Sequence, residues 1–294
     1  MMEKINCPLF EKKTVLKNYI NVKDYSNTQE EFTIVSCETT NFLFTNPRPK
    51  EKDISKYYDF EDYISHSNKK NDFISKLYQV VRSFSIKRKY KLISKLIRSK
   101  KILDIGSGTG EFLGYMKIKR FDTYGVEIAK KARELSIKNH GLFVKDSLAS
   151  LKEKNFDIIT MWHVLEHVYD LDGYMKKIKS LLNDNGIVII AVPNHKCFDQ
   201  KYYGKHWAGW DVPLHLWNFD KDSMIKLSNK YGLDISSIHP LYFDSFYVSL
   251  LSSKYKHNSS KLVQSFLIGL YSNLIAKFKT GEYSSLIYVL KKSI

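Results

Sequence analysis

The sequence predicts an α/β protein built on a doubly wound, mostly parallel, seven-stranded sheet. Three observations support this prediction. A short apolar run at residues 102–105 is followed by three alternating glycines and a helical pattern. Further apolar runs alternate along the chain with amphipathic segments, as in parallel strands joined by right-handed crossovers. Acidic residues follow three of these runs, at the strand ends where open α/β sheets bind ligands.

The first turn of the predicted sheet is rich in glycine. It lies between the strand at residues 102–105 and a helix that opens at residues 112–116, a geometry that lets the backbone approach a ligand closely. A dinucleotide motif, G-x-G-x-x-G, would need a small residue where the chain has Glu111. The pattern is instead Asp-x-Gly-x-Gly-x-Gly, and Asp104 suits a ligand with a positive amino group. The alternative to a ligand-binding turn is an ordinary tight connection between a strand and a helix.

This pattern resembles the first motif of the class I S-adenosylmethionine-dependent methyltransferases. The resemblance implies a Rossmann-like sheet whose last strand is antiparallel, with S-adenosylmethionine as cofactor. The second strand, at residues 123–128, contains Glu127, about twenty residues past the glycines, where a carboxylate accepts both ribose hydroxyls. The third strand, at 142–144, precedes Asp146, which the resemblance places near the adenine amine. The expected cofactor-binding residues are Asp104, Gly106, Ser107, Gly108, Gly110, Glu127, Ile128, Asp146, Ser147 and His163.

The remaining strands and helices complete the sheet. Strands are expected at residues 156–161, 186–192, 233–238 and 283–291. Helices are expected at 129–139, 171–182 and 219–231, the last capped by Asp220. Residues 241–280 form a helical insertion before the last strand, which could serve as a lid, a homodimer face or an in-plane membrane helix.

The N-terminal region, residues 1–70, is predicted to be a small β-rich module and linker that precede the methyltransferase domain at 71–294. Cys7-Pro-Leu-Phe10 and Cys37-Glu-Thr-Thr40 each look like a C-x-x-C knuckle without its second thiol. They resemble the zinc-ribbon extension of many bacterial small-molecule methyltransferases. A structural zinc site needs four ligands, so we expect no zinc here. In the family, the segment like residues 57–66 lies over the cofactor and acceptor mouth.

The amino-acid composition bears on the domain number, the cellular location and the binding partners of the protein. The 294 residues and their apolar content suit one large or two small domains, with neither a secretory leader nor a membrane-spanning run. Three cysteines, an odd number, favour reduced thiols and a cytoplasmic location. The formal charge of +16 would suit nucleic acid, but abundant Lys, Ile, Asn, Tyr and Ser also fit a biased base composition. Direct nucleic-acid binding is therefore not expected.

The predicted helix at residues 71–100 is strongly basic. No acid occurs between Asp72 and Asp104, whereas lysine and arginine recur throughout. A solvated helix face is the favoured interpretation, because most charge runs are of this kind. Capture of an acidic substrate and contact with an anionic membrane surface stay open.

Candidate catalytic histidines lie after the fourth and fifth strands. His163-Val-Leu-Glu-His167 matches an inverted zinc-protease motif, but that motif needs a helix and here it follows a strand. No metal ligand is therefore predicted. Residues 194–218, rich in Trp, Tyr and His, are expected to form an acceptor loop. A histidine titrates near neutrality and can remove a hydroxyl proton. The candidates are His215, His206 and His163, in that order.

The sequence thus predicts a methyltransferase similar to the ubiquinone-type O-methyltransferases. Its acceptor would be a small molecule, phenolic, sugar-like or lipid-linked, methylated on a hydroxyl oxygen. Two alternatives stay open. One is a cofactor-binding protein that has lost catalysis and serves as an interaction or membrane-associated module, and the other is an RNA methyltransferase.

Overall fold

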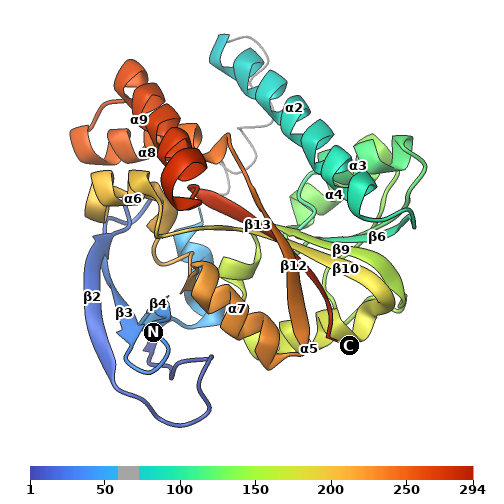
Figure 1. Ribbon diagram of the computed structural model, residues 1–294, viewed down its shortest axis with the longest axis horizontal. Coiled ribbons are helices and arrows are strands. Elements are labelled where there is room, and N and C mark those ends of the chain that lie inside the picture. The colour runs from blue at the N-terminus through green and yellow to red at the C-terminus, as the bar shows by residue number, and fades with distance from the viewer. Residues whose placement is uncertain (59–72, 294) are drawn as a thin grey trace.

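The computed structural model describes residues 1–58 and 73–293 (Figure 1). Most of the segment 57–66, expected over the cofactor mouth, lies outside the described residues. Between residues 73 and 80 only the course of the helix is described.

The central sheet has seven strands and confirms the predicted fold class. Their spatial order is β12-β13-β10-β9-β6-β7-β8. Strand β13 runs antiparallel to both of its neighbours, whereas the pairs from β10 to β8 are parallel. The strands are β6 (Lys101–Ile105), β7 (Asp122–Val126), β8 (Phe143–Lys145), β9 (Phe156–Trp162), β10 (Leu182–Pro193), β12 (Leu233–Pro240) and β13 (Ser285–Lys292).

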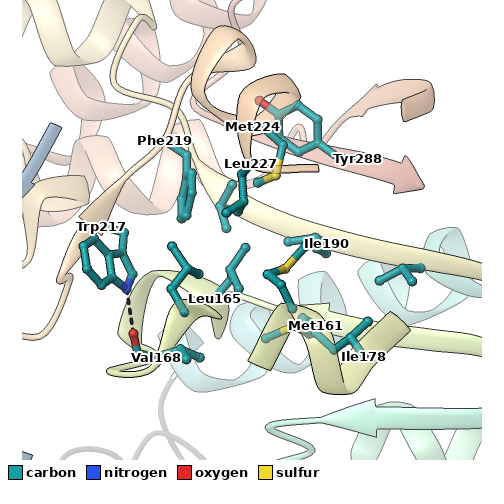
Figure 2. Close-up of a cluster of buried hydrophobic side chains, with 14 of the residues drawn as sticks. Met161, Leu165, Val168, Ile178, Ile190, Trp217, Phe219, Met224, Leu227 and Tyr288 are labelled. Atoms are coloured by element: carbon teal, nitrogen blue, oxygen red, sulfur yellow. Dashed lines mark hydrogen bonds between the residues drawn. The ribbon is translucent and has the colours of Figure 1, made fainter. Parts of the chain in front are cut away.

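Helices cover both faces of this sheet. One apolar cluster joins the sheet to α2 (Phe73–Leu96) and α3 (Glu111–Ile118). The other joins it to α5 (Leu171–Leu181) and α7 (Lys221–Lys230), and Figure 2 shows side chains of both helices packed against β9, β10 and β13. Helix α4 (Lys130–His140) links β7 to β8. As predicted, Asp220 caps α7, accepting a hydrogen bond from the Ser223 amide at 2.9 Å.

The N-terminal residues form a second, antiparallel sheet. Its order is β11-β4-β3-β2, with β2 (Leu16–Lys23), β3 (Glu31–Cys37), β4 (Leu43–Thr45) and β11 (Trp217–Asn218). Strand β1 (Met2–Glu3) pairs with β5 (Arg48–Pro49), and a 3-10 helix, η1, spans Glu51–Tyr57. Because β11 comes from the end of the expected acceptor loop, this sheet ties the first fifty residues to that loop.

The two knuckle cysteines are buried beside the N-terminal sheet. Cys7 Sγ lies 3.3 Å from the Thr40 hydroxyl. Burial raises the pKa of Cys7 to about 11. Thr40, at the position where a second knuckle thiol would stand, thus supplies a hydroxyl partner to Cys7 in place of a thiolate.

The aromatic loop, expected to contact the acceptor, packs its two central tryptophans into the core. It folds into α6 (Phe198–Tyr203) and two 3-10 turns, η3 (Gly204–His206) and η4 (Ala208–Trp210). Trp207 and Trp210 are buried in a cluster with side chains of β2, β3 and β4. The indole of Trp207 donates to Asp199 at 2.8 Å, and that of Trp210 to the Gly204 carbonyl at 3.0 Å. The tryptophans therefore join two parts of the core.

Residues between β12 and β13 form a helical hairpin. It consists of α8 (Asp244–His257) and α9 (Leu262–Ile275), followed by a π-helical turn, η5 (Ala276–Thr280). Figure 1 shows both helices beside α6, at the upper left of the molecule. None of the helices in the described parts of the chain is both long and apolar enough to cross a bilayer.

Candidate active site

The glycine turn between β6 and α3 is open at its centre. Gly106, Gly108 and Gly110 all have positive φ, a conformation that suits glycine. A Cβ at Gly106 would clash with Val164, at 2.3 Å, whereas a Cβ at Gly108 would meet nothing within 4 Å. The buried Ser107 hydroxyl has no hydrogen-bond partner among the described residues. The middle of the turn thus offers free space beside an unused polar group.

Glu127 holds this turn from the neighbouring strand. It follows β7 directly and is 6% exposed. Its carboxylate accepts one hydrogen bond from the Gly108 amide and one from the Ala129 amide, each at 2.8 Å. Charge-assisted bonds of this kind are among the stronger ones. A carboxylate has about four acceptor sites, so Glu127 keeps capacity for further donors.

Asp104 is buried within β6 rather than in the turn. Thr160 donates to its carboxylate at 2.6 Å. Burial raises the pKa of Asp104 and lowers that of Lys89 on α2, while the opposite charges of the pair partly offset both effects. The Lys89 ammonium also lies 4.0 Å from the centre of the Trp162 ring.

Asp146 lies at the end of β8. Because Val126 pairs with Lys145, the residues that follow, Glu127 and Asp146, emerge side by side from the sheet. The Asp146 carboxylate accepts from the Ser150 hydroxyl at 2.8 Å and from Ser147 at 3.1 Å. These bonds lower the pKa of Asp146. Ile128, beside Glu127, is 75% exposed, so an apolar surface is available near both acids.

His163 is clamped between two carboxylates. Its Nε2 lies 2.8 Å from Asp244 at the start of α8, and its Nδ1 lies 3.2 Å from Glu166. Burial opposes the charge, but the two carboxylates prevail and raise the pKa of His163 to about 10. The residue also has φ +57°, a strained conformation outside glycine. At neutral pH His163 is therefore an imidazolium that binds its proton firmly.

His167 and His215 form a second, neutral pair. Their rings meet edge to face, with centroids 4.7 Å apart. Each ring has its Nδ1 at a backbone carbonyl, that of Leu214 at 3.0 Å and that of Gly209 at 2.8 Å. A carbonyl accepts only from a protonated nitrogen, so each Nε2 keeps its lone pair. Burial lowers the pKa of His167 to about 4 and lowers that of His215 as well.

Glu166 connects the cationic and the neutral histidines. It is fully buried, and its Oε2 has no hydrogen-bond partner among the residues the structure describes. One ligand atom from each of Glu166, His167 and His215 lies within 4.8 Å of the other two. Two imidazoles and a carboxylate are ligands that Zn²⁺ and Fe²⁺ accept. The sequence predicted no metal ligand, but this cluster has the donor set to hold a divalent cation.

The N-terminal sheet positions His215. The hydroxyl of Thr45 in β4 donates to the His215 carbonyl at 2.8 Å, and the Thr45 amide donates to the Leu216 carbonyl at 3.0 Å. Glu166 accepts the Leu216 amide through its own carbonyl at 2.8 Å. His215 is thus fixed from both the N-terminal sheet and the turn after β9.

The Tyr58 phenol responds to charges of both the glycine turn and the histidine cluster. Burial, followed by the charges of Asp211, Glu127 and Glu166, raises the pKa of Tyr58 to about 12. These carboxylates act on one phenol, so the carboxylate of the turn and those of the cluster border the same region. Asp211 itself lies 3.8 Å from Nε2 of His215, and burial raises its pKa to about 6.

His206 stands apart from this cluster. Its ring packs against Tyr25 of the N-terminal region, with centroids 5.4 Å apart. Burial and the charge of Lys205 lower the pKa of His206. The structure thus places His163 and His215 on either side of Glu166 and directs His206 toward a different neighbour.

Several residues of the site were not singled out as candidates from the sequence, among them Asp244, Lys89 and Glu166. Asp244 lies 81 positions from His163, and no local sequence motif predicts the contact between them. Lys89 is one of many lysines and arginines on the basic helix α2, and nothing in the sequence distinguishes it from the others. Glu166 did have a signal, the H-x-x-E-H pattern, but that pattern was set aside because it follows a strand.

Comparisons with known proteins identify the family of this chain. Residues 79–238 match the model of the methyltransferase domain family, which is more than half of the 294-residue chain. A ubiquinone biosynthesis O-methyltransferase from Pelagibacter ubique is 29% identical over 178 residues, covering 56% of this chain and 72% of that protein. The enzyme of the same name from Rickettsia prowazekii is 26% identical over 161 residues, covering 50% of this chain and 60% of that protein.

A solved structure shares the fold. The magnesium protoporphyrin IX methyltransferase of Synechocystis, with bound S-adenosylhomocysteine, aligns with a TM-score of 0.52 and 14% identity, covering 79% of this chain and 94% of that one. By the family match over most of the central sheet, the chain belongs to the methyltransferase domain family and is a class I S-adenosylmethionine-dependent methyltransferase.

Proposed function

We propose that this enzyme methylates a hydroxyl oxygen of a small-molecule acceptor. The observation that carries the proposal is a neutral, nearly buried His215 that shares a cluster with Glu166 and His167, while the charges of Glu166 and of the turn residue Glu127 both act on the Tyr58 phenol. A hydroxyl must lose its proton as the methyl group arrives, and such a base is what O-methylation needs. The names of the curated relatives, both O-methyltransferases, point the same way.

In this proposal the cofactor lies over the glycine turn. Glu127 accepts the ribose hydroxyls, Asp146 and Ser147 border the adenine, and Asp104 with Ser107 supports the amino-acid end. Gly106, Gly108 and Gly110 let the backbone approach, and Ile128 covers one face of the adenine. The methyl group moves from the sulfonium sulfur to the acceptor oxygen in one displacement, and the hydroxyl proton goes to Nε2 of His215.

His163 has no proton-accepting role in this proposal. A ring whose pKa is about 10 stays protonated at neutral pH. It instead holds Glu166 and Asp244 in place, and thereby the turn after β9 and the start of α8. His206 likewise takes no part in the proton transfer, because its ring packs against Tyr25, away from the histidine cluster.

The direct test is transfer of a labelled methyl group. The purified chain is incubated with methyl-labelled S-adenosylmethionine and a panel of catechols, sugars and lipid-linked phenols. We expect label on a hydroxyl oxygen of one class. Label only on nitrogen or carbon would contradict hydroxyl transfer, and tight cofactor binding without any transfer would favour the inactive binding module. Label on added RNA, lost at raised salt, would favour the RNA enzyme.

A divalent cation at Glu166, His167 and His215 is a second way to remove the proton. A bound cation would lower the pKa of a coordinated hydroxyl, and His215 would then be a ligand. Treatment with a chelator separates the two. A rate that falls on chelation and returns with Zn²⁺ or Fe²⁺ assigns the cation, whereas an unchanged rate leaves His215 as the base.

The pH dependence of stability tests the clamp on His163. Because its folded pKa is raised to about 10, its stabilising effect is full below the ordinary histidine pKa, about 6.5, and is lost as pH rises through the folded value. Asp244→Asn should therefore destabilise the protein most near pH 6 and least near pH 10, in urea unfolding across that range. Asp184→Asn, at a surface ion pair, is the control. An equal loss at every pH would contradict the assigned charge.

A further inference from the structure

The α8–α9 hairpin buries small residues and exposes large apolar ones. The buried positions of α8 are all serine: Ser245, Ser249, Ser252 and Ser253. Those of α9 are Ser265, Gly269 and Ser272. A surface helix of a globular protein normally turns its large apolar face inward. Helix α9 does the reverse, so packing on its inner face does not account for its exposed leucines and phenylalanine.

The small residues let the two helices approach closely and fix the hairpin on the enzyme. A Cβ at Gly269 would lie 2.9 Å from the backbone of Phe246, so only glycine fits there. The Ser272 hydroxyl donates to Asp199 at 2.6 Å, and the Asn273 amide donates to the Tyr242 carbonyl at 2.9 Å. Close contact through serine and glycine is typical of helices that pack within lipid. The orientation of α9 is thus set by specific contacts.

The outward face of α9 is a continuous apolar surface, which we call the α9 ridge. Its members recur every three or four positions and therefore share one side of the helix. Exposure ranges from 38% at Leu270 to 75% at Val263. The ridge consists of Leu262, Val263, Phe266, Leu267, Leu270, Tyr271 and Leu274, and Phe278 extends it at 71% exposure. Exposed patches of this kind mark interaction sites.

Positive charge surrounds the ridge. Residues 245–281 contain five lysines and no aspartate or glutamate. The lysines lie at both ends of α9, which itself has no charged residue, and at the end of α8; they are Lys254, Lys256, Lys261, Lys277 and Lys279. The basic helix α2 adjoins the start of α8, where the rings of Phe84 and Phe243 meet with centroids 5.6 Å apart.

We propose that the α9 ridge docks the enzyme on the surface of an anionic lipid bilayer, with α9 in the plane of the interface. The 14 residues of α9 span only about 21 Å at 1.5 Å per residue, too short to cross the apolar core. An apolar face between flanking lysines is the pattern of in-plane helices on anionic membranes. A second copy of the chain fits less well, because a symmetric interface would bring lysines together without acids between them.

The docking face is joined to the candidate active site. Asp244, the first residue of α8, pairs with His163 at 2.8 Å, and Ser252 of α8 accepts the Ala208 amide at 2.8 Å. Under the proposed function, on which this step rests, the acceptor would be an amphipathic hydroxyl compound held in the same bilayer. Membrane docking itself does not depend on the identity of the acceptor.

Flotation with lipid vesicles tests the docking. The full chain should float with vesicles of phosphatidylcholine mixed with phosphatidylglycerol, and much less with phosphatidylcholine alone. Val263→Glu together with Leu267→Glu should abolish flotation. Ile118→Glu, which changes an equally exposed residue on α3 (76%), should not. Lys277→Ala should weaken binding about fivefold, since one basic residue near an anionic surface contributes about that factor.

Other outcomes would overturn the proposal. Loss of flotation in all variants alike, or equal binding to both vesicle types, would contradict it. A concentration-dependent dimer by light scattering, dissociated by the double substitution, together with no flotation, would assign the ridge to a second copy. Cofactor binding is measured in parallel for every variant, so a folding defect is recognised. Because flotation needs no methyl acceptor, its result is independent of the proposed reaction.

Discussion

Glu127→Ala is expected to remove most of the affinity for S-adenosylmethionine. The carboxylate holds the Gly108 and Ala129 amides at 2.8 Å each, and it is the proposed acceptor of the ribose hydroxyls. Hydrogen bonds to a charged group contribute about 1.5–3 kcal/mol each. Loss of the two proposed bonds to the ribose hydroxyls would therefore raise the Kd for S-adenosylmethionine on the order of 100-fold or more. Isothermal titration calorimetry with the purified variant measures this directly.

Two controls separate ligand contact from damage to the fold. Glu134→Ala changes an exposed carboxylate on α4, paired only loosely with Lys130 at 3.9 Å, and should leave Kd unchanged. Gly108→Val can be compared with Gly204→Val, because both glycines have positive φ and neither Cβ would meet an atom within 4 Å. Loss of binding only at position 108, with both variants folded, would place the ligand there. Unchanged affinity in both Glu127→Ala and Gly108→Val would reject the cofactor site.

His215→Ala is expected to lower kcat by about 10²- to 10⁴-fold, the usual contribution of a general base, with little change in cofactor affinity. In the proposed site the ring acts on the acceptor and not on the cofactor, so the two effects should separate. The measurements are kcat with the identified acceptor and Kd for S-adenosylmethionine. His239→Ala, at a histidine that hydrogen-bonds Ser237 on β12, serves as control. An unaffected turnover would remove His215 from the chemistry.

The pH profile sharpens this prediction. Burial lowers the pKa of His215, and a base must be deprotonated to act. The rate should therefore fall only on the acidic side, with an apparent pKa below the ordinary histidine value of about 6.5. A rate that instead declines on the acidic side with a midpoint well above neutrality would point to another base.

The sheet could be predicted from the sequence because its signals are local. Apolar runs a few residues long, separated by amphipathic helices, determine strands wherever both faces are covered. Glu127 was found by its distance from the glycines alone. The start of β10 was missed, because Asn183-Asp-Asn-Gly186 reads as a turn, yet the strand runs through it from Leu182 with a register shift before Ile187.

The candidate active site could be predicted only in part, because its contacts join distant segments. The pairing of His163 with Asp244 and the influence of Asp211 on Tyr58 depend on how an insertion and a loop fold back. The aromatic residues of segment 194–218 also allowed two interpretations. Trp207 and Trp210 suit an acceptor lining or a core equally well in sequence, and only their burial against the N-terminal strands decides between them.

The strand β11 has a practical consequence for protein engineering. Since Thr45 bonds the His215 backbone, and Trp217 and Asn218 complete the N-terminal sheet, the first fifty residues and the segment around His215 form one cooperative unit. A chimera that imports residues 194–218 from a relative should fold only when the matching N-terminal strands come with it. The loop is therefore expected to be exchangeable between relatives as a pair of segments and not as a single graft.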